Sequence, residues 1–167
     1  TGHELEVSTG TMIFLGNLII NGTLTSNSSQ INLGGHWTNN GTFNGSSTTL
    51  NFNGTSSDQN ITGGATFYKV KVNKSSKTLI VSDNVDFNIT FTGSYSLLVN
   101  SGVLDWSLNS VTVDIDGNCL IQPAGTVLGL CKSGIAEIDI SGTFTADFQD
   151  GVMSIDGIPG LNDDPTK

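Results

Sequence analysis

The sequence predicts an all-β protein, a β-solenoid of about seven coils with roughly 20 residues in each. The first observation is a recurring phrase, found as Asn21-Gly22-Thr23-Leu24, Asn40-Gly41-Thr42-Phe43 and Ser141-Gly142-Thr143-Phe144. The second is a series of small-residue corners in steps of 17 to 23 residues, at Gly22, Gly41, Gly64, Asn84, Gly102, Gly125 and Gly142. The third is the lack of any helical pattern between them, so each repeat is expected to form one coil of short strands.

Apolar and polar residues alternate in the segments that separate these corners. The alternating segments are 18–20, 31–33, 49–52, 67–72, 78–81 and 111–115. Alternation with a period of two is typical of strands that bury one face. We therefore expect Leu, Ile, Val and Phe to point inward, so that stacked coils bury one continuous core, while Thr, Ser, Asn and Lys point outward.

The whole chain, 1–167, is expected to be one domain with three parts. Residues 1–20 form an N-terminal strand segment available for pairing, residues 21–157 form the coils, and residues 158–167 form a polar tail. In this tail Pro159, Gly160 and Pro165 would interrupt any strand.

The charge balance limits the partners. The net charge is −9, with six Lys and no Arg. This argues against nucleic acid and against anionic membranes, which both need a basic surface. No apolar run is long enough for a membrane helix, so we expect no membrane insertion.

The ends of a solenoid expose unpaired backbone groups, which proteins either cap or use for pairing with another chain. No amphipathic helix that could serve as a cap is evident in the sequence. The apolar segment Met12, Ile13, Phe14 and Leu15 is the candidate subunit contact. A head-to-tail contact between such edges would build an open fibre from copies of this chain.

Acceptor sequons for N-linked glycans occur only in the first part of the chain, before residue 90. They are Asn21, Asn27, Asn40, Asn44, Asn53, Asn60, Asn73 and Asn88. The alternative explanation is structural, because Asn-Gly-Thr also suits tight corners.

Acidic residues gather in the other half, where ten of the fifteen lie after residue 101. Candidate calcium ligands are Asp114, Asp116, Glu137, Asp139 and Asp156. If these positions stack on successive coils, their carboxylates would repel one another unless a cation bridges them, and calcium prefers oxygen ligands of this kind. Solvated surface carboxylates are the alternative, and no other cofactor is expected.

Two cysteines, Cys119 and Cys131, flank a Pro123-Ala124-Gly125 corner. The strands on either side could face each other, which predicts a disulfide, with a pair of buried thiols as the alternative. The two histidines, His3 and His36, lack a neighbouring nucleophile motif, so we expect no enzymatic activity, although Asp147 and Asp150 could in principle form a glycosidase pair.

Part of the chain resembles a repeat of secreted bacterial and archaeal surface proteins of the adhesin-like and surface-layer kind. The resemblance is carried by Gly35–Phe43 with its Trp-Thr-Asn-Asn-Gly-Thr-Phe phrase, and by 48–55, 59–63 and 67–73. It implies tandem β-solenoid coils at the cell surface and implies no chemistry. It covers about half of the chain, and Cys119 and Cys131 have no counterpart in it.

The sequence therefore favours a secreted, glycosylated structural protein whose subunits join end to end into an extracellular filament or surface coat. The start at Thr1 fits either a processed secreted chain or a piece of a longer one. The main alternative is a glycan- or surface-binding module of an adhesin, with Trp37, Tyr68, Tyr95 and Trp106 as exposed aromatic platforms. Both tryptophans could instead fill the core, and a third hypothesis, ice binding through Thr-x-Thr triplets, has only irregular support.

Overall fold

The structure is a computed structural model. It describes residues 3–83, 85–88, 95–106, 112–116, 118–128, 137–140 and 144–146. Within these ranges the regular structure consists of seventeen β-strands. Their parallel stacking confirms the predicted all-β β-solenoid.

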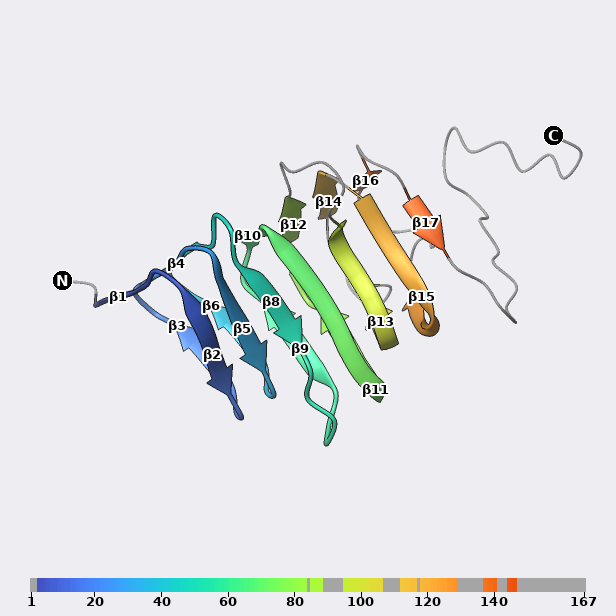
Figure 1. Ribbon diagram of the computed structural model, residues 1–167, viewed down its shortest axis with the longest axis horizontal. Coiled ribbons are helices and arrows are strands. Elements are labelled where there is room, and N and C mark those ends of the chain that lie inside the picture. The colour runs from blue at the N-terminus through green and yellow to red at the C-terminus, as the bar shows by residue number, and fades with distance from the viewer. Residues whose placement is uncertain are drawn as a thin grey trace, which may run out of the picture.

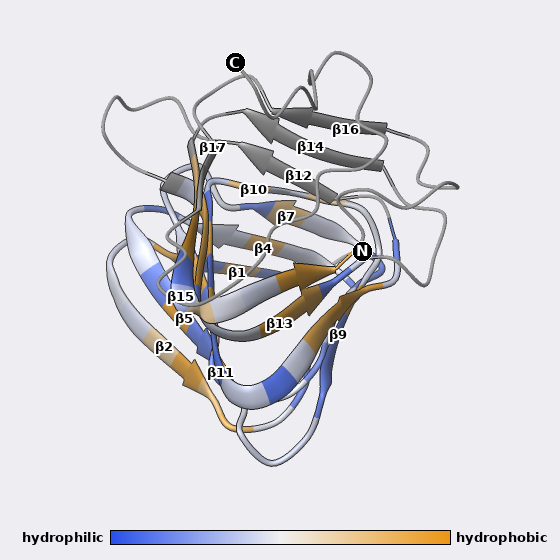
Figure 2. Cartoon of the chain, turned by 90° about the vertical axis from the view of Figure 1, so that its right-hand side faces the viewer, coloured by the Kyte–Doolittle hydropathy of each residue, from blue (hydrophilic) through white to orange (hydrophobic). Residues whose placement is uncertain are grey.

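The strands form three faces around one core (Figures 1 and 2). The first face contains β1 (Glu4–Val7), β4 (Thr23–Ser26), β7 (Thr42–Asn44), β10 (Ala65–Phe67), β12 (Val85–Asn88), β14 (Thr112–Asp116) and β16 (Glu137–Ile140). The second contains β2 (Gly10–Phe14), β5 (Ser29–Leu33), β8 (Thr49–Phe52) and β17 (Phe144–Ala146), with the first parts of β11 (Lys69–Val81), β13 (Tyr95–Asp105) and β15 (Asn118–Leu128). The third contains β3 (Leu18–Ile20), β6 (Trp37–Asn39) and β9 (Gln59–Thr62), and the later parts of β11 and β13 continue it.

The early coils are regular and the later ones are longer. Partners in the first coils are 19 residues apart, as in the hydrogen bond between Asn40 and Asn21. The spacing grows to 27 residues between Val70 and Leu97. Residues 3–106 make about five turns, slightly fewer than the seven coils predicted for the chain, and β14 to β17 continue the stacking beyond them.

The corner assignment from sequence is wrong for part of the chain. Gly22 and Gly41 lie at the corner that precedes the first face, whereas Gly102 and Gly125 pair with each other inside β13 and β15, at the corner between the second and third faces. Likewise, Phe43 lies on the first face but Phe144 lies on the second, beside Cys119. The coils change in length along the chain. Similar sequence phrases therefore lie at different positions in the coil once residues are inserted before them.

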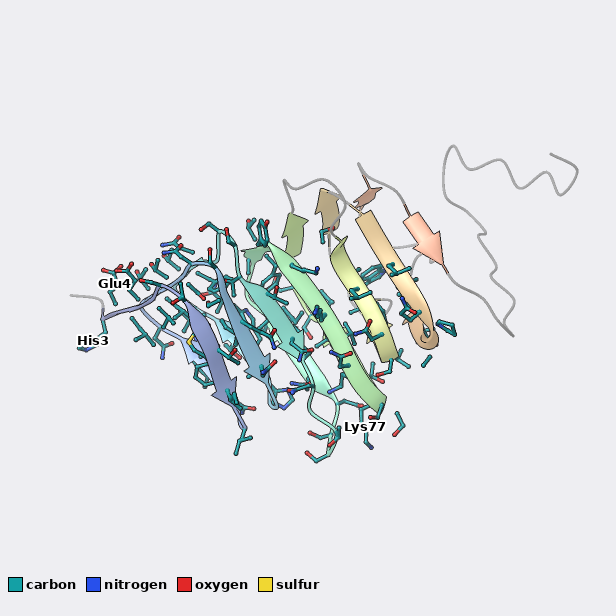
Figure 3. The ribbon with its side chains drawn as sticks, viewed as in Figure 1. His3, Glu4 and Lys77 are labelled. Atoms are coloured by element: carbon teal, nitrogen blue, oxygen red, sulfur yellow. The ribbon has the colours of Figure 1, made fainter. Side chains whose placement is uncertain are left out.

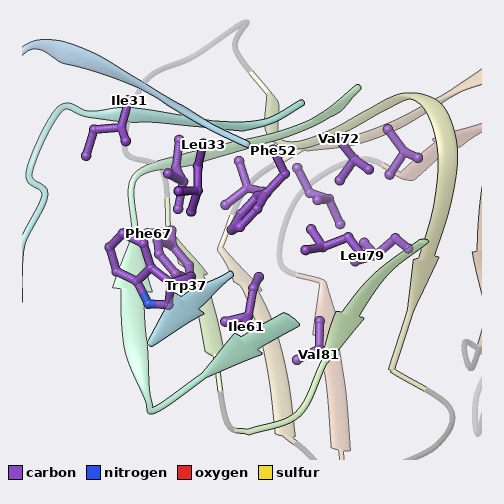
Figure 4. Close-up of a cluster of buried hydrophobic side chains, with 14 of the residues drawn as sticks. Ile31, Leu33, Trp37, Phe52, Ile61, Phe67, Val72, Leu79 and Val81 are labelled. Atoms are coloured by element: carbon purple, nitrogen blue, oxygen red, sulfur yellow. The ribbon is translucent and has the colours of Figure 1, made fainter. Parts of the chain in front are cut away.

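Strand alternation determines the core, as predicted. One inward column runs through Ile31, Leu50, Val70, Leu97 and Cys119, and a second runs through Leu33, Phe52, Val72, Val99 and Ile121. All ten side chains are buried, and several are visible in Figure 4. Each residue of a column packs against its partner one coil away, so the coils stabilise one another in series.

An aromatic cluster closes the core near the start of the third face. The Trp37 ring meets the rings of Phe43 and Phe67 edge to face, at centroid distances of 4.9 and 5.3 Å. Trp37 and Trp106 are both fully buried. This confirms that the tryptophans fill the core, and the prediction that they are exposed sugar-stacking platforms is wrong.

Candidate functional site

The first coil presents an open edge. Residues 4–20, expected to be a pairing segment ahead of the coils, form a complete coil of β1, β2 and β3. Each of these strands pairs on one side, with β4, β5 and β6 respectively, and has no second partner among the described residues. His3 and Glu4 lie at this end of the rod in Figure 3. The backbone groups on the free side are available for another strand.

Core positions are also uncovered at this edge. Leu5 pairs with Leu24, which is 4% exposed, yet Leu5 itself is 54% exposed. A hollow of about 410 Å³ opens beside it, lined in part by Leu18 and Ile20. The end of the core is therefore an open hollow lined in part by apolar side chains.

The predicted subunit contact belongs to this edge. Met12 and Phe14 begin the two inward columns, since they pair with Ile31 and Leu33. Ile13 and Leu15 point outward instead and are 67% and 89% exposed. The segment thus provides both a free strand edge and exposed apolar side chains.

The sequon asparagines differ in accessibility. Asn21, Asn40, Asn44 and Asn53 are exposed, and Asn27 and Asn60 are half-buried. Several already bond across coils, as Asn40 Nδ2 donates to Asn21 Oδ1 at 3.0 Å and Ser46 Oγ donates to Asn27 Oδ1 at 3.0 Å. This is the corner chemistry that was the structural alternative to glycosylation; the side chain of Asn88 lies outside the description.

Asn73 is the sequon least suited to a glycan. It belongs to a ladder on the outer side of the second face, in which Asn51 donates to Asn32, Asn73 donates to Asn51 and Asn100 donates to Asn73, at 2.9, 2.6 and 2.7 Å. The Asn73 amide thus uses both its nitrogen and its oxygen. A glycan on Nδ2 would interrupt this ladder.

The backbone register brings three acidic residues together on the first face. Asp86 pairs with Asp114, and Asp114 pairs with Asp139. Asp114 and Asp139 were among the candidate calcium ligands named from the sequence, whereas Asp86, 28 positions before Asp114, was not. Asp116 pairs with Asn88 and Glu137 pairs with Thr112, while Asp156 lies outside the described residues.

Replacing Asp114 with asparagine distinguishes bridged from solvated carboxylates. Like charges at paired positions of adjacent strands cost about 0.2–1 kcal/mol, so without calcium the variant should unfold at a higher temperature than the parent. If calcium bridges the column, the parent should gain stability from added calcium and Asp114→Asn should lose most of that gain. Thermal unfolding in EGTA measures the effect of the substitution without calcium, and thermal unfolding in millimolar calcium measures the gain in stability from the ion. Asp83→Asn is the control.

Cys119 follows Leu97 in an inward column, and its side chain is buried. Burial raises its pKa to about 12, so the reactive thiolate is suppressed at neutral pH. Cys131 lies outside the described residues, and the predicted disulfide therefore stays a prediction.

A buried polar cluster that the sequence analysis missed fixes the corner after β8. The Lys74 ammonium is fully buried and donates to Gln59 Oε1 at 2.6 Å, to the Gly54 carbonyl at 2.8 Å and to the Ser57 carbonyl at 3.3 Å. Gln59 in turn donates to the backbone carbonyls of Leu33 and Gly35. The cluster thereby binds the inserted corner to the neighbouring coils.

Burial lowers the pKa of Lys74 to about 8, with a smaller contribution from Lys77 in the same direction and an opposing one from Asp58. All three acceptors of the ammonium are neutral oxygens. The alternation of Val70, Val72 and Lys74 on one side of β11 was the signal in the sequence that could have identified it.

Neither a metal-binding cluster nor a membrane-spanning helix is found among the described residues. Among the residues whose side chains are described, no group of three His, Cys, Asp or Glu could hold a metal ion; the side chains of Asp86, Asp114 and Asp139 lie outside this description. His36 Nδ1 accepts a hydrogen bond from the Asn60 backbone at 3.0 Å, a structural contact between coils. No helix in the described part is long and apolar enough to cross a membrane.

Comparison of the chain with protein-family models, with curated proteins and with solved structures gave no significant match.

Proposed function

We propose that this chain is a structural subunit that assembles end to end, through the strand edges of its first and last coils, into an extracellular filament or surface coat. The observation that carries the proposal is the first coil, where Leu5 occupies a core position and is 54% exposed beside an apolar hollow. A further coil placed on this edge would cover Leu5 and pair with β1, β2 and β3.

The strand directions support a head-to-tail arrangement. All pairs among the described strands are parallel, so a coil from a second copy can continue the same parallel ladders. The last described strand of the second face is β17, which pairs with β15 and has no further partner among the described strands. A contact between β17 of one copy and β2 of the next repeats the internal geometry, and such a contact generates an open fibre.

The proposal includes an extracellular location and glycans on the exposed sequons, with Asn21, Asn40, Asn44 and Asn53 as the most accessible asparagines. The adhesin alternative is less well supported. Trp37 and Trp106 are buried and Tyr68 is half-buried, so no row of exposed aromatic side chains forms from these three.

Leu5→Lys tests the proposal. The lysine is partly solvated on the free edge, so the monomer should keep its stability within about 1 kcal/mol. At a junction the same charge would be buried without a partner, so assembly should be lost or require at least about tenfold higher concentration. Light scattering and sedimentation over a range of protein concentrations measure the concentration at which the chain assembles.

The control is Thr25→Lys, which adds the same charge on β4 at a half-buried position beside the buried Leu24. It should assemble like the parent. Equal assembly by Leu5→Lys would rule out the first coil as the contact.

A further inference from the structure

Lys74 and Gln59 bring a side-chain amine and a side-chain amide together in the core. Lys74 Nζ lies 2.6 Å from Gln59 Oε1, and both side chains are fully buried. The carbonyl carbon Cδ of Gln59 is bonded to that oxygen, so the lysine nitrogen adjoins the atom that an amine attacks in an amide. Two reacting groups held in contact by a fold react as if each were present at very high concentration.

The amide of Gln59 is held in one orientation by four hydrogen bonds. Its Nε2 donates to the backbone carbonyl of Leu33 at 2.9 Å and to that of Gly35. Its Oε1 accepts from the backbone N–H of Gly54 at 3.0 Å and from Lys74. Exchanging the oxygen and the nitrogen would place donors against donors and acceptors against acceptors, so the carbonyl group faces the lysine.

The backbone N–H of Gly54 is placed to stabilise the charge that such an attack creates. When an amine adds to the amide carbon, the carbonyl oxygen becomes an oxyanion, and a fixed N–H donor lowers the barrier. The close approach of this corner requires glycine, because a Cβ on Gly54 would lie 2.2 Å from the Gly34 carbonyl oxygen and 3.0 Å from Gln59 Oε1. The corner thus supplies both the donor and the space for the amide.

The nitrogen of Lys74 is available as a neutral amine. Because burial lowers its pKa to about 8, about a tenth of the molecules hold the uncharged form at pH 7 and most hold it at pH 9. The charged groups that act on this nitrogen are Asp58, which raises the pKa, and Lys77, which lowers it. A lysine desolvated in this way is a nucleophile, as in enzymes that use lysine for covalent chemistry.

Water is kept away from both reacting groups. The carbonyl groups of Gly54 and Ser57, in the corner between β8 and β9, bind the lysine nitrogen at 2.8 and 3.3 Å. On the side of the next coil, Gly102 packs against the lysine stem, since a Cβ on Gly102 would lie 2.7 Å from Lys74 Cβ. Exclusion of water suppresses hydrolysis of the Gln59 amide, which is the competing reaction.

We infer that Lys74 and Gln59 form an intramolecular isopeptide bond with release of ammonia. The Nζ lone pair forms a bond to Cδ of Gln59, the bond between Cδ and Nε2 breaks, and one proton passes from Nζ to Nε2, which leaves as NH₃. One amide replaces another, so no oxidant, reductant or second substrate is needed. The new bond joins β9 of one coil to β11 of the next.

The bond adds a covalent tie to a structural subunit and does not depend on the assembly proposed above. It closes the loop of residues 59–74 and restricts the unfolded chain as a disulfide does. It also anchors one end of the corner 55–58, whose residues are exposed. A linked chain has no ammonium at Lys74, so only chains in which the bond has not formed show the alkaline pH dependence of this group.

Mass spectrometry of the intact full-length chain tests the inference. As purified or after incubation for days at pH 9, the chain is expected to be lighter by one ammonia, about 17 Da, and a tryptic digest should contain two peptides joined through Gln59 and Lys74. Trypsin should no longer cleave after Lys74 in the linked chains. In concentrated urea the bond should form at least about a hundredfold more slowly, because unfolding separates the two groups.

Two variants identify the source of the lost mass. Lys74→Met removes the nucleophile and should keep its full mass, whereas Lys77→Met keeps the reacting pair and should lose the same mass as the parent. Asn-Gly sequences such as Asn21-Gly22 also lose one ammonia when the asparagine closes a ring on the backbone. A loss of mass that persists in Lys74→Met would therefore belong to an asparagine and would overturn the inference.

Measurements on the parent chain decide the question even where a variant fails to fold. Full mass after the incubation, with Gln59 and Lys74 recovered in separate unmodified peptides, overturns the inference. A gain of about 1 Da at Gln59 shows that water has hydrolysed the amide, and this also overturns it. Neither result touches the proposed assembly, which light scattering and sedimentation measure independently.

Discussion

Replacing Phe52 with aspartate is expected to unfold the coils around it. Phe52 is fully buried in an inward column between Leu33 and Val72. The substitution removes an aromatic side chain, a loss of about 3–5 kcal/mol, and places a carboxyl group in the core without a partner. Because each coil is stabilised chiefly by its two neighbours, the loss extends to the coils that contain Leu33 and Val72.

Chemical unfolding monitored by circular dichroism measures this effect. The matched control is Asn53→Asp, one residue further along the chain, where the side chain is exposed and the same charge should change stability by less than about 0.5 kcal/mol. A Phe52→Asp chain as stable as the parent would show that the inward register of β8 is wrong.

The second large effect is a dependence of stability on alkaline pH that originates from Lys74. Its pKa is about 8 in the folded chain, compared with 10.5 for an ordinary lysine. Between these values the folded state has released the proton while the unfolded state still holds it. The unfolded state then binds more protons, so stability rises with pH across this window.

Lys74→Met should remove this rise. The free energy of unfolding of the parent, taken relative to Lys74→Met, is expected to increase by up to about 3 kcal/mol between pH 7.5 and pH 10.5. The comparison uses the change with pH, because the variant also leaves the acceptors Gly54, Ser57 and Gln59 without their donor at every pH.

Lys77→Met, on the same strand, is the control; it should retain most of the pH dependence of the parent, because burial is the largest cause of the Lys74 shift and the charge of Lys77 adds only a smaller part. A constant difference between the parent and Lys74→Met across the window would contradict the assignment of a buried ammonium at this position.

The sequence was sufficient for the fold because the alternation of apolar and polar residues depends only on neighbouring residues. It placed Leu50, Phe52, Val70 and Val72 inward, and all four are buried. The sequence did not predict where the corners of the later coils lie, because the lengths of inserted segments are not encoded in a local pattern. Gly102 was therefore assigned to the wrong corner.

The candidate site was predictable only in part. The apolar segment from Met12 to Leu15 was recognised, but the exposure of Leu5 depends on which coil is the first, and this depends on the three-dimensional stacking. Lys74 was missed because lysine is rarely buried, although its place in the alternation of β11 was visible. Asp86 was missed because its pairing with Asp114 spans a coil of unusual length.

Electron microscopy of the purified chain without any added partner tests the central claim most directly. Head-to-tail stacking predicts unbranched filaments with an axial repeat of about 34 Å, the length of a rod of seven stacked strands at about 4.8 Å each. Separate short rods at concentrations well above those needed for a stable contact would contradict end-to-end assembly.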